Sequence, residues 1–251
     1  MAEQPSADRA DVRITALEAE LAAVRAEMQN FTYAVSHDLR APLRHIASYA
    51  QLVQEDAGPQ LSAEVQEFLT TITDSARHMG VMLDGLMALC RVGTVPMEIT
   101  AVSLQELVMA VCQELGAQYP ERAIEWRIAN DLPMVRADAT LSRQALVQVL
   151  GNAVKFTVQR HPAVIEVACI VETPGRHVTL QIKDNGVGYN PALQAQLLRV
   201  FGRLHSVNQF AGIGVGLVLT QKILERLGGS LAIQGAVDAG CNVRLQLKAD
   251  R

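Results

Sequence analysis

The sequence predicts an α+β protein in two parts, an antiparallel helical hairpin followed by an α/β sandwich. Through the N-terminal third, apolar residues recur at alternating steps of three and four, the periodicity of amphipathic helices that pair with other helices. Farther along, helical periods alternate with short strand patterns, which favours helices packed on a mostly antiparallel sheet. With 251 residues, 49% of them hydrophobic, the chain is long enough for two domains and a sizeable core.

The composition argues against nucleic-acid binding and against a membrane span. The formal net charge is -4, and no apolar run approaches the ~20 residues that span a bilayer. The first residues lack the basic and apolar regions of a signal peptide. The four cysteines are far apart and show no CxxC spacing, which disfavours structural zinc and disulfides. We therefore expect a cytoplasmic protein with reduced thiols.

The first helix carries a coiled-coil seam. Residues 1 to about 10 are polar and small, so we expect a frayed end or linker. The apolar positions that follow alternate in steps of three and four, and we call them the seam: Ile14, Leu17, Leu21, Val24, Met28, Phe31 and Val35. So narrow a stripe favours pairing with a partner helix, most simply in a parallel homodimer. Residues 1–30 are thus predicted to be a linker and coiled-coil signalling helix.

Residues 31–93 continue this pattern into a hairpin. Pro42 lacks an amide donor and should kink the first helix, which ends at the turn residues 57–60. A second heptad helix begins at about Ser62. Two such helices cannot close their own core, whereas two copies make a dimeric four-helix bundle. His37 would lie on the outer surface of that bundle.

The second part follows a boundary at residues 91–96 and is predicted to span 97–251. Ser103 should cap a helix that runs to about Gln118, with Glu106 as its capping-box partner. A long helix is expected at 139–156 and another at 215–227. The predicted strands lie at 123–128, 132–138, 163–171, 177–183, 230–234 and 241–247.

Four short motifs have the composition of a phosphoryl-transfer site. His37 precedes Asp38, which can hold one ring nitrogen protonated and leave the other free to attack. On one face of the long helix lie Gln148, Asn152 and Lys155, whose amides suit Mg²⁺ and whose ammonium suits phosphate. Taken singly, the first motif is better explained as an exposed histidine beside a solvated acid, and the second as a solvated helix face.

The other two motifs are rich in glycine. Asp184 ends a strand and could accept from an adenine amine, while Gly186 and Gly188 permit close backbone approach. Gly212, Gly214 and Gly216 open a helix whose amides can face phosphates, although they match neither a P-loop nor a dinucleotide fingerprint. Alone, each is also explained as a tight turn.

In this order, the four motifs resemble the histidine, asparagine and two glycine boxes of the sensor histidine kinases of two-component systems. The resemblance covers essentially the whole chain from His37 to Leu247. The sequence around His37 is also similar to the phytochrome-type and PAS-linked soluble kinases. The ATP-binding half is similar to the wider superfamily that includes the gyrase, heat-shock and mismatch-repair ATPases. The resemblance thus implies a transmitter module, with a phosphotransfer hairpin and an ATP-binding catalytic domain.

The resemblance implies a role for each motif. His37 would accept a phosphoryl group from ATP and pass it to an aspartate of a response regulator, with Asp38 as the base. Asn152 and Gln148 would hold Mg²⁺, Lys155 would contact phosphate, and Asp184 would read the adenine amine. The glycines 186, 188, 212, 214 and 216 would shape the pocket and its lid. Phe201 would anchor the lid by packing, and Arg203 would either reach a phosphate or remain a solvated lid charge.

Three residues depart from the family pattern. Gln148 replaces the usual first asparagine, which changes the reach of the ligand and its ordering entropy, so we expect weaker metal binding. Ile213 stands where Thr or Ser is usual, which removes a hydroxyl donor worth about 1 kcal/mol. Ala41 stands where many members carry the Thr or Asn that positions a water to dephosphorylate the regulator. The sequence therefore predicts a kinase with weak or absent phosphatase activity.

A second function is compatible with these departures, namely a non-catalytic dimeric scaffold that docks a response regulator or other kinases. The input signal and the cognate regulator are not legible in the sequence. An upstream sensor domain would attach to the coiled coil in cis or act in trans. Whether ATP reaches His37 of the same or the other subunit depends on the turn near Gly58.

Overall fold

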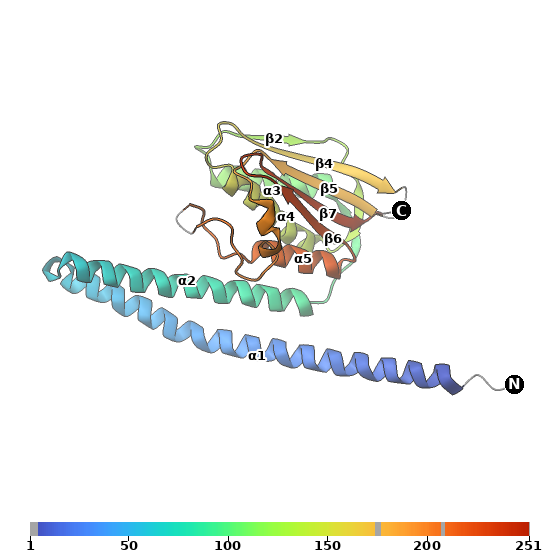
Figure 1. Cartoon of the computed structure of the whole chain (residues 1–251), viewed down its shortest axis with the longest axis horizontal. Coiled ribbons are helices and arrows are strands. Elements are labelled where there is room, and N and C mark those ends of the chain that lie inside the picture. Colours follow the sequence, from blue (N-terminus) through green and yellow to red (C-terminus); the bar gives the residue numbers. More distant parts are fainter. Residues whose placement is uncertain (1–4, 174–176, 207–208, 251) are drawn as a thin grey trace. The chain divides into compact units, whose positions relative to one another are not determined.

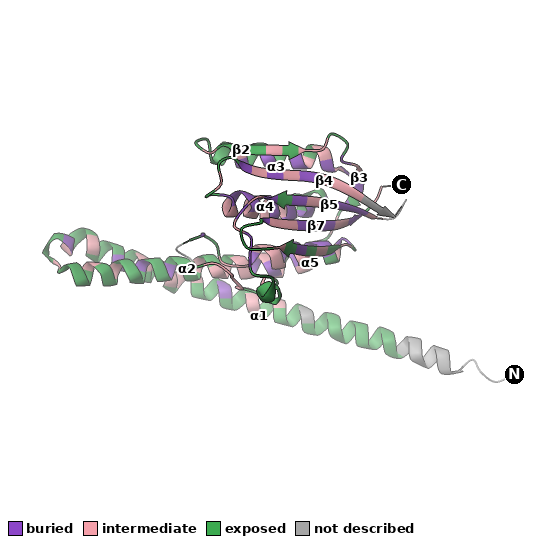
Figure 2. Cartoon of the chain, turned by 45° about the horizontal axis from the view of Figure 1, so that its top comes forward, coloured by how far each residue is buried: buried purple, intermediate pink, exposed green. Residues whose placement is uncertain are grey.

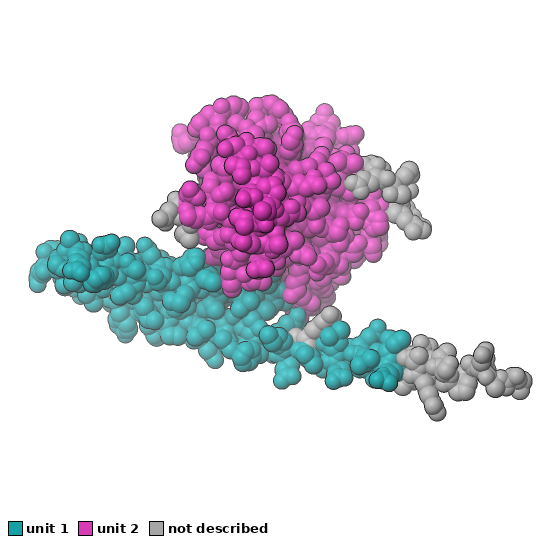
Figure 3. Space-filling model, viewed as in Figure 1, with its two compact units in different colours: residues 1–90 teal, residues 91–251 magenta. Residues whose placement is uncertain are grey.

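The computed structural model describes residues 5–173, 177–206 and 209–250, with side chains for residues 13–24, 26–170, 177–206 and 209–250. The chain divides into two compact units, residues 1–90 and 91–251 (Figure 3). The first four residues of the predicted linker lie outside the described residues, as does the tip of the turn expected at 173–175. None of the described helices is both long enough and apolar enough to cross a membrane.

The first unit is dominated by one long helix, α1, which spans Pro5–Ala57 (Figure 1). The prediction of a frayed end or linker is wrong for residues 5–10, which are helical. Proline is well tolerated at the first helical position, because its fixed φ suits the helix and its missing amide would have no partner there. The helix passes through Pro42 without ending, and its ribbon changes direction in the light-blue stretch of Figure 1.

A tight connection turns α1 into the antiparallel helix α2. The 3-10 turn η1, Gly58–Gln60, leads into α2, Ala63–Thr94. The side chain of Gln66 fastens the connection by donating to the carbonyl oxygens of Gly58 (2.7 Å) and Leu61 (3.3 Å). Farther along, Arg40 Nη2 and Asp84 Oδ1 lie 2.9 Å apart and tie the two helices together. The predicted hairpin is therefore confirmed.

The seam of α1 is exposed in this chain. Exposed fractions along it run from 38% at Val35 to 64% at Met28, and most of α1 is green in Figure 2. On α2, five large apolar side chains are likewise exposed: Val65, Phe68, Ile72, Met79 and Val81. Apolar side chains in such a continuous line normally mark a surface for another protein. The hairpin therefore leaves a large part of its apolar surface uncovered.

The second unit contains a five-stranded, mostly antiparallel sheet in the order β2-β4-β5-β7-β6. Its strands are β2 (Ile124–Ile128), β4 (Ala163–Thr173), β5 (His177–Asp184), β6 (Ser230–Gly235) and β7 (Cys241–Lys248). Only β2 and β4 pair in parallel within this sheet. A separate antiparallel pair joins β1 (Thr100–Ser103) to β3 (Met134–Ala137). Strand β1 was not predicted, because its pairing with β3 is decided by tertiary contacts.

Three helices lie together on one face of this sheet: α3 (Leu104–Gln118), α4 (Ala139–Phe156) and α5 (Gly216–Arg226) (Figure 1). Ser103 caps α3 as predicted, its side chain accepting from the Glu106 amide. Asp138 caps α4 in the same way, accepting from the amide of Leu141. Fully buried aliphatic side chains fill the space between helices and sheet: Leu146, Leu150, Ile165, Leu180, Ile182, Ile223 and Leu245. The predicted α/β sandwich is confirmed.

Candidate functional site

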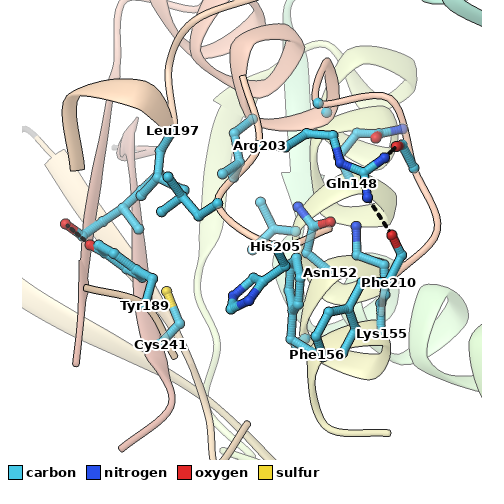
Figure 4. Close-up of a pocket in the computed structure, with 18 of the residues that line it drawn as sticks. Gln148, Asn152, Lys155, Phe156, Tyr189, Leu197, Arg203, His205, Phe210 and Cys241 are labelled. Atoms are coloured by element: carbon cyan, nitrogen blue, oxygen red, sulfur yellow. Dashed lines mark hydrogen bonds between the residues drawn. The ribbon is translucent and has the colours of Figure 1, made fainter. Parts of the chain in front are cut away.

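A cavity of about 260 Å³ opens in the second unit between α4, the end of β5 and the chain that leads to α5 (Figure 4). Past the 3-10 turn η2 (Pro191–Gln196), this chain covers one side of the cavity. We call residues 197–206 and 209–215 the lid. Of the predicted nucleotide residues, all but Gly186 and Phe201 line the cavity. The structure therefore gathers most of the predicted nucleotide residues around one cavity.

The α4 face contributes Gln148, Asn152 and Lys155, which the structure brings together as their spacing predicted. Burial, and to a smaller extent the charge of Arg203, lowers the pKa of Lys155 to about 8. Its ammonium lies 4.4 Å from the centre of the Phe156 ring, a cation–π contact. A Cβ added to Gly216 would meet Gln148 Oε1 at 2.5 Å, so this amide packs directly against the start of α5.

Asp184, at the end of β5, is a buried carboxylate with only part of its bonding capacity used. Its Oδ1 accepts from the amides of Gly186 (2.8 Å) and Cys241 (3.2 Å). Burial raises its pKa to about 6, although these two hydrogen bonds oppose the shift. Among the described residues, nothing donates to Oδ2, so this oxygen can accept from a ligand. The turn continues to Gly188, where φ is 60° and a Cβ would lie 1.8 Å from the Ala236 carbonyl oxygen, so only glycine fits.

The lid is held by contacts of its own backbone and of Arg203. The Phe201 amide donates to the Gly214 carbonyl (3.1 Å), and Gly214 itself has a φ of 73°. Arg203 donates to the carbonyls of Gly212 and Phe210. Two roles were left open for Arg203, a phosphate contact and a solvated lid charge, and the structure shows neither directly. Its guanidinium donates to lid carbonyls, and its charge lowers the pKa of Lys155.

The structure does not place Phe201 in the cavity wall, and its predicted role as a packing anchor of the lid stays a prediction. Phe201 is half-buried and has a φ of 64°. A lid aromatic that does line the cavity is Phe210, which is 6% exposed and lies 5.0 Å from the Phe156 ring, centre to centre. His205 completes this cluster and was also missed. The scarcity of aromatic residues, 4% of the chain, was the one signal that could have drawn attention to these rings.

His37 and Asp38 lie in the first unit, on α1. His37 Nδ1 and Asp38 Oδ1 are 3.2 Å apart, and their side chains are 67% and 82% exposed. The ring of Tyr33, one helical turn earlier, lies nearly parallel to the imidazole at 6.4 Å. Among the described contacts, Nε2 has no partner, so the solvent-facing nitrogen is the one available to an electrophile.

Comparison with known families identifies the two units that carry the His37–Asp38 pair and the cavity. Residues 27–94 match the family model of the His Kinase A (phospho-acceptor) domain, and residues 137–251 match that of the Histidine kinase-, DNA gyrase B-, and HSP90-like ATPase. The chain belongs to the sensor histidine kinases. The two matched segments are the phospho-acceptor and ATPase parts of a histidine kinase transmitter module.

Similar proteins include other histidine kinases and phytochromes. Cyanobacterial phytochrome B of Nostoc is 30% identical over 89% of this chain and 30% of its own length. The methanogenesis regulatory histidine kinase FilI of Methanothrix harundinacea is 31% identical over 91% of this chain and 25% of its own. The chain therefore spans less than a third of the length of these relatives.

Solved structures share the fold at low sequence identity. Full-length ShkA, in complex with AMPPNP, has a TM-score of 0.63 and 23% identity, over 88% of this chain and 46% of that one. The histidine kinase AdeS of Acinetobacter baumannii has a TM-score of 0.59 and 16% identity, over 86% of this chain and 98% of that one. These likenesses confirm the histidine kinase fold.

Proposed function

We propose that this chain is an ATP-dependent kinase that phosphorylates its own His37 and passes the phosphoryl group to an aspartate of a response regulator. One observation carries the proposal. A single chain holds an exposed His37–Asp38 pair and, in its other unit, a cavity whose buried groups suit a nucleotide. Family membership supports both halves of this reading.

In this proposal, ATP binds with its adenine toward Asp184 and its phosphates toward Lys155. The open Oδ2 of Asp184 accepts from the adenine amine, which favours the ionised carboxylate. Lys155 and the nearby Arg203 supply positive charge at the other end of the cavity. The AMPPNP complex of the structurally similar ShkA supports an adenine nucleotide as the ligand.

Mg²⁺ is expected to bind with the nucleotide rather than in a protein cage. The described residues contain no group of three or more His, Cys, Asp or Glu side chains that could hold a metal ion. The amide oxygen of Asn152, half-buried in the cavity wall, suits a hard cation that takes few protein ligands and several phosphate oxygens. Gln148 would add a second amide oxygen only by turning away from Gly216. The metal would neutralise charge on the phosphates.

At His37, the geometry favours attack through Nε2. Asp38 accepts a hydrogen bond from Nδ1–H, which leaves the Nε2 lone pair free to attack. A bond forms between Nε2 and the γ-phosphorus, the bond to the bridging oxygen breaks, and ADP leaves. The imidazolium that results is stabilised by Asp38, which takes up the Nδ1 proton. Little further covalent help is needed, because phosphoryl transfer depends mainly on positioning and charge neutralisation.

We further propose that the module is a homodimer that transmits in one direction, in the cytoplasm, under an upstream sensor domain in cis or in trans. A second hairpin would cover the exposed seam and complete a four-helix bundle. Ala41, one turn after His37, has no polar atom with which to position a hydrolytic water. Purified phosphorylated regulator, incubated with this chain and ADP, should therefore keep its phosphate. Fast loss caused by the kinase would contradict this part of the proposal.

The kinase is tested by labelling with radioactive ATP and Mg²⁺. Wild type should become labelled, and His37→Ala should not. The substitution lies on an exposed helix face, so the variant should keep wild-type stability and nucleotide affinity. The absence of label from both proteins would instead favour the scaffold, a reading to which Gln148 and Ile213 lend some support.

A further inference from the structure

The side chain of His205 connects the lid to the turn that follows β5. Its Nε2 lies 3.0 Å from the carbonyl oxygen of Gly188, in the turn that begins at Asp184. The bonds of Phe201 and Arg203 stay within the lid. At its two ends the lid is hydrogen-bonded to its chain neighbours, by Leu197 to Gln194, Arg199 to Gln196 and Leu219 to Val215. Among the described residues, the His205–Gly188 contact is the one hydrogen bond between the lid and a part of the unit distant in sequence.

The same ring also joins the lid to α4. It lies 5.5 Å from the ring of Phe156 on α4 and 5.1 Å from the ring of Phe210 in the lid, centre to centre. Phe156 and Phe210 are themselves 5.0 Å apart, so the three rings form a closed triangle. These separations lie within the range of favourable aromatic pairs. Figure 4 shows the imidazole between Tyr189 and Cys241 on one side and Phe156 on the other.

The chemistry of this contact is specific to histidine. A carbonyl oxygen can only accept, so Nε2 must carry a hydrogen, while the flat ring fills its place in the triangle. Phenylalanine could fill the same space but has no donor. Glutamine has a donor of similar reach but no ring. The two contributions can therefore be separated by substitution.

We propose that His205 is a positioning residue, a latch that holds the lid against the Asp184–Gly188 turn and so retains the nucleotide. This inference rests on the proposed nucleotide site. His205 contacts the turn that contains Asp184, the carboxylate proposed to read the adenine. The closed lid therefore also holds this turn in place. A nucleotide can leave only after the latch has opened, so His205 should act mainly on the dissociation rate.

The test measures the dissociation rate of fluorescently labelled ADP by stopped-flow displacement, with the full chain. His205→Phe should raise this rate about three- to tenfold, the range expected from one neutral hydrogen bond. His205→Gln, which keeps a donor but loses the ring, should also raise the rate, so the two variants report the hydrogen bond and the ring packing separately. In autophosphorylation, KM for ATP should rise while kcat stays within about twofold of wild type, a split that general loss of folding would not give.

Ser206→Ala is the matched control, since Ser206 is the exposed lid neighbour of His205. It should leave the dissociation rate unchanged. A His205→Phe rate equal to that of wild type, or an equal increase in Ser206→Ala, would overturn the latch. Failure of the proposed function looks different, because wild type itself would then bind no labelled ADP.

Discussion

The two units solve the problem of apolar surface in opposite ways. The ATPase unit buries its large aliphatic side chains completely, with Leu150, Ile165 and Leu180 at 0% exposure. The hairpin leaves a line of apolar residues open along α1, with Leu21 at 50%. A closed core permits buried charges with shifted pKa values, whereas an open helix face invites a partner. The comparison teaches that the proposed nucleotide site is enclosed within one unit, whereas the apolar face of the hairpin is left open for a partner.

The largest expected effect concerns the hairpin and tests whether its exposed seam is a dimer interface. Leu21→Glu places a charge in the seam of both helices, each of which loses about 1.5–3 kcal/mol of apolar burial. The dimer dissociation constant should rise by about a hundredfold or more. Glu20→Gln, on an exposed position outside the seam, should change it little. Analytical ultracentrifugation measures both, and an unchanged dissociation constant for Leu21→Glu would show that the seam is not the interface.

The substitution Asp184→Asn tests the ATPase unit, by removing the carboxylate proposed to read the adenine. The amide can still accept from the Gly186 and Cys241 amides through its oxygen, but it then presents an NH₂ group to the adenine amine. Two donors face each other, and nucleotide affinity should fall about ten- to a hundredfold. Calorimetric titration with ADP measures this fall. Dimerisation should be unaffected, and equal affinity in wild type and variant would mean that Asp184 does not read the base.

The buried charges of the ATPase unit predict a bell-shaped pH dependence of nucleotide binding. Asp184, with a pKa of about 6, must be ionised to accept from the amine, so affinity should fall as the pH drops below that value. Lys155, with a pKa of about 8, must be protonated to attract phosphate, so affinity should also fall as the pH rises above it. Near pH 8, bound phosphate raises the pKa of Lys155, and binding should take up protons.

Calorimetry in buffers with different ionisation enthalpies detects this uptake. Lys155→Arg, which stays charged, should abolish the alkaline limb and the proton uptake while keeping the acid limb. Binding that releases protons near pH 8 would contradict this placement of Lys155.

The smallest expected effect sharpens the comparison with the family. Ile213→Thr restores a hydroxyl where the lid lines the cavity, and one neutral hydrogen bond is worth about 1 kcal/mol. ATP affinity should therefore rise about fivefold. Ile213→Val, which shortens the side chain without adding a donor, is the control. If both variants bind alike, the family hydroxyl has no counterpart in this lid.

The sequence was most informative where regular structure fixes spacing. On α4, a step of four and then three residues was enough to place Gln148, Asn152 and Lys155 on one face, as the structure confirms. Ser103 was also recognised, because capping depends on neighbours in the chain. Both predictions needed only local geometry.

The lid shows why the remainder could not be predicted. Its backbone has no regular period, so nothing in the sequence says that Phe210 packs on Phe156 and lines the cavity. The contact between His205 and Gly188 joins residues that are 17 positions apart through a fold-dependent approach. The four residues of β1 were missed because their pairing with β3 is decided by tertiary contacts.

The most direct test of the central claim is to determine which atom becomes phosphorylated. After incubation with ATP and Mg²⁺, nuclear magnetic resonance of protein labelled with ¹⁵N in histidine distinguishes the two ring nitrogens of His37. The Asp38 contact at Nδ1 predicts a phosphoryl group on Nε2, and none on any site in His37→Ala. Phosphate on Nδ1, or on another residue while His37 stays unmodified, would contradict the account.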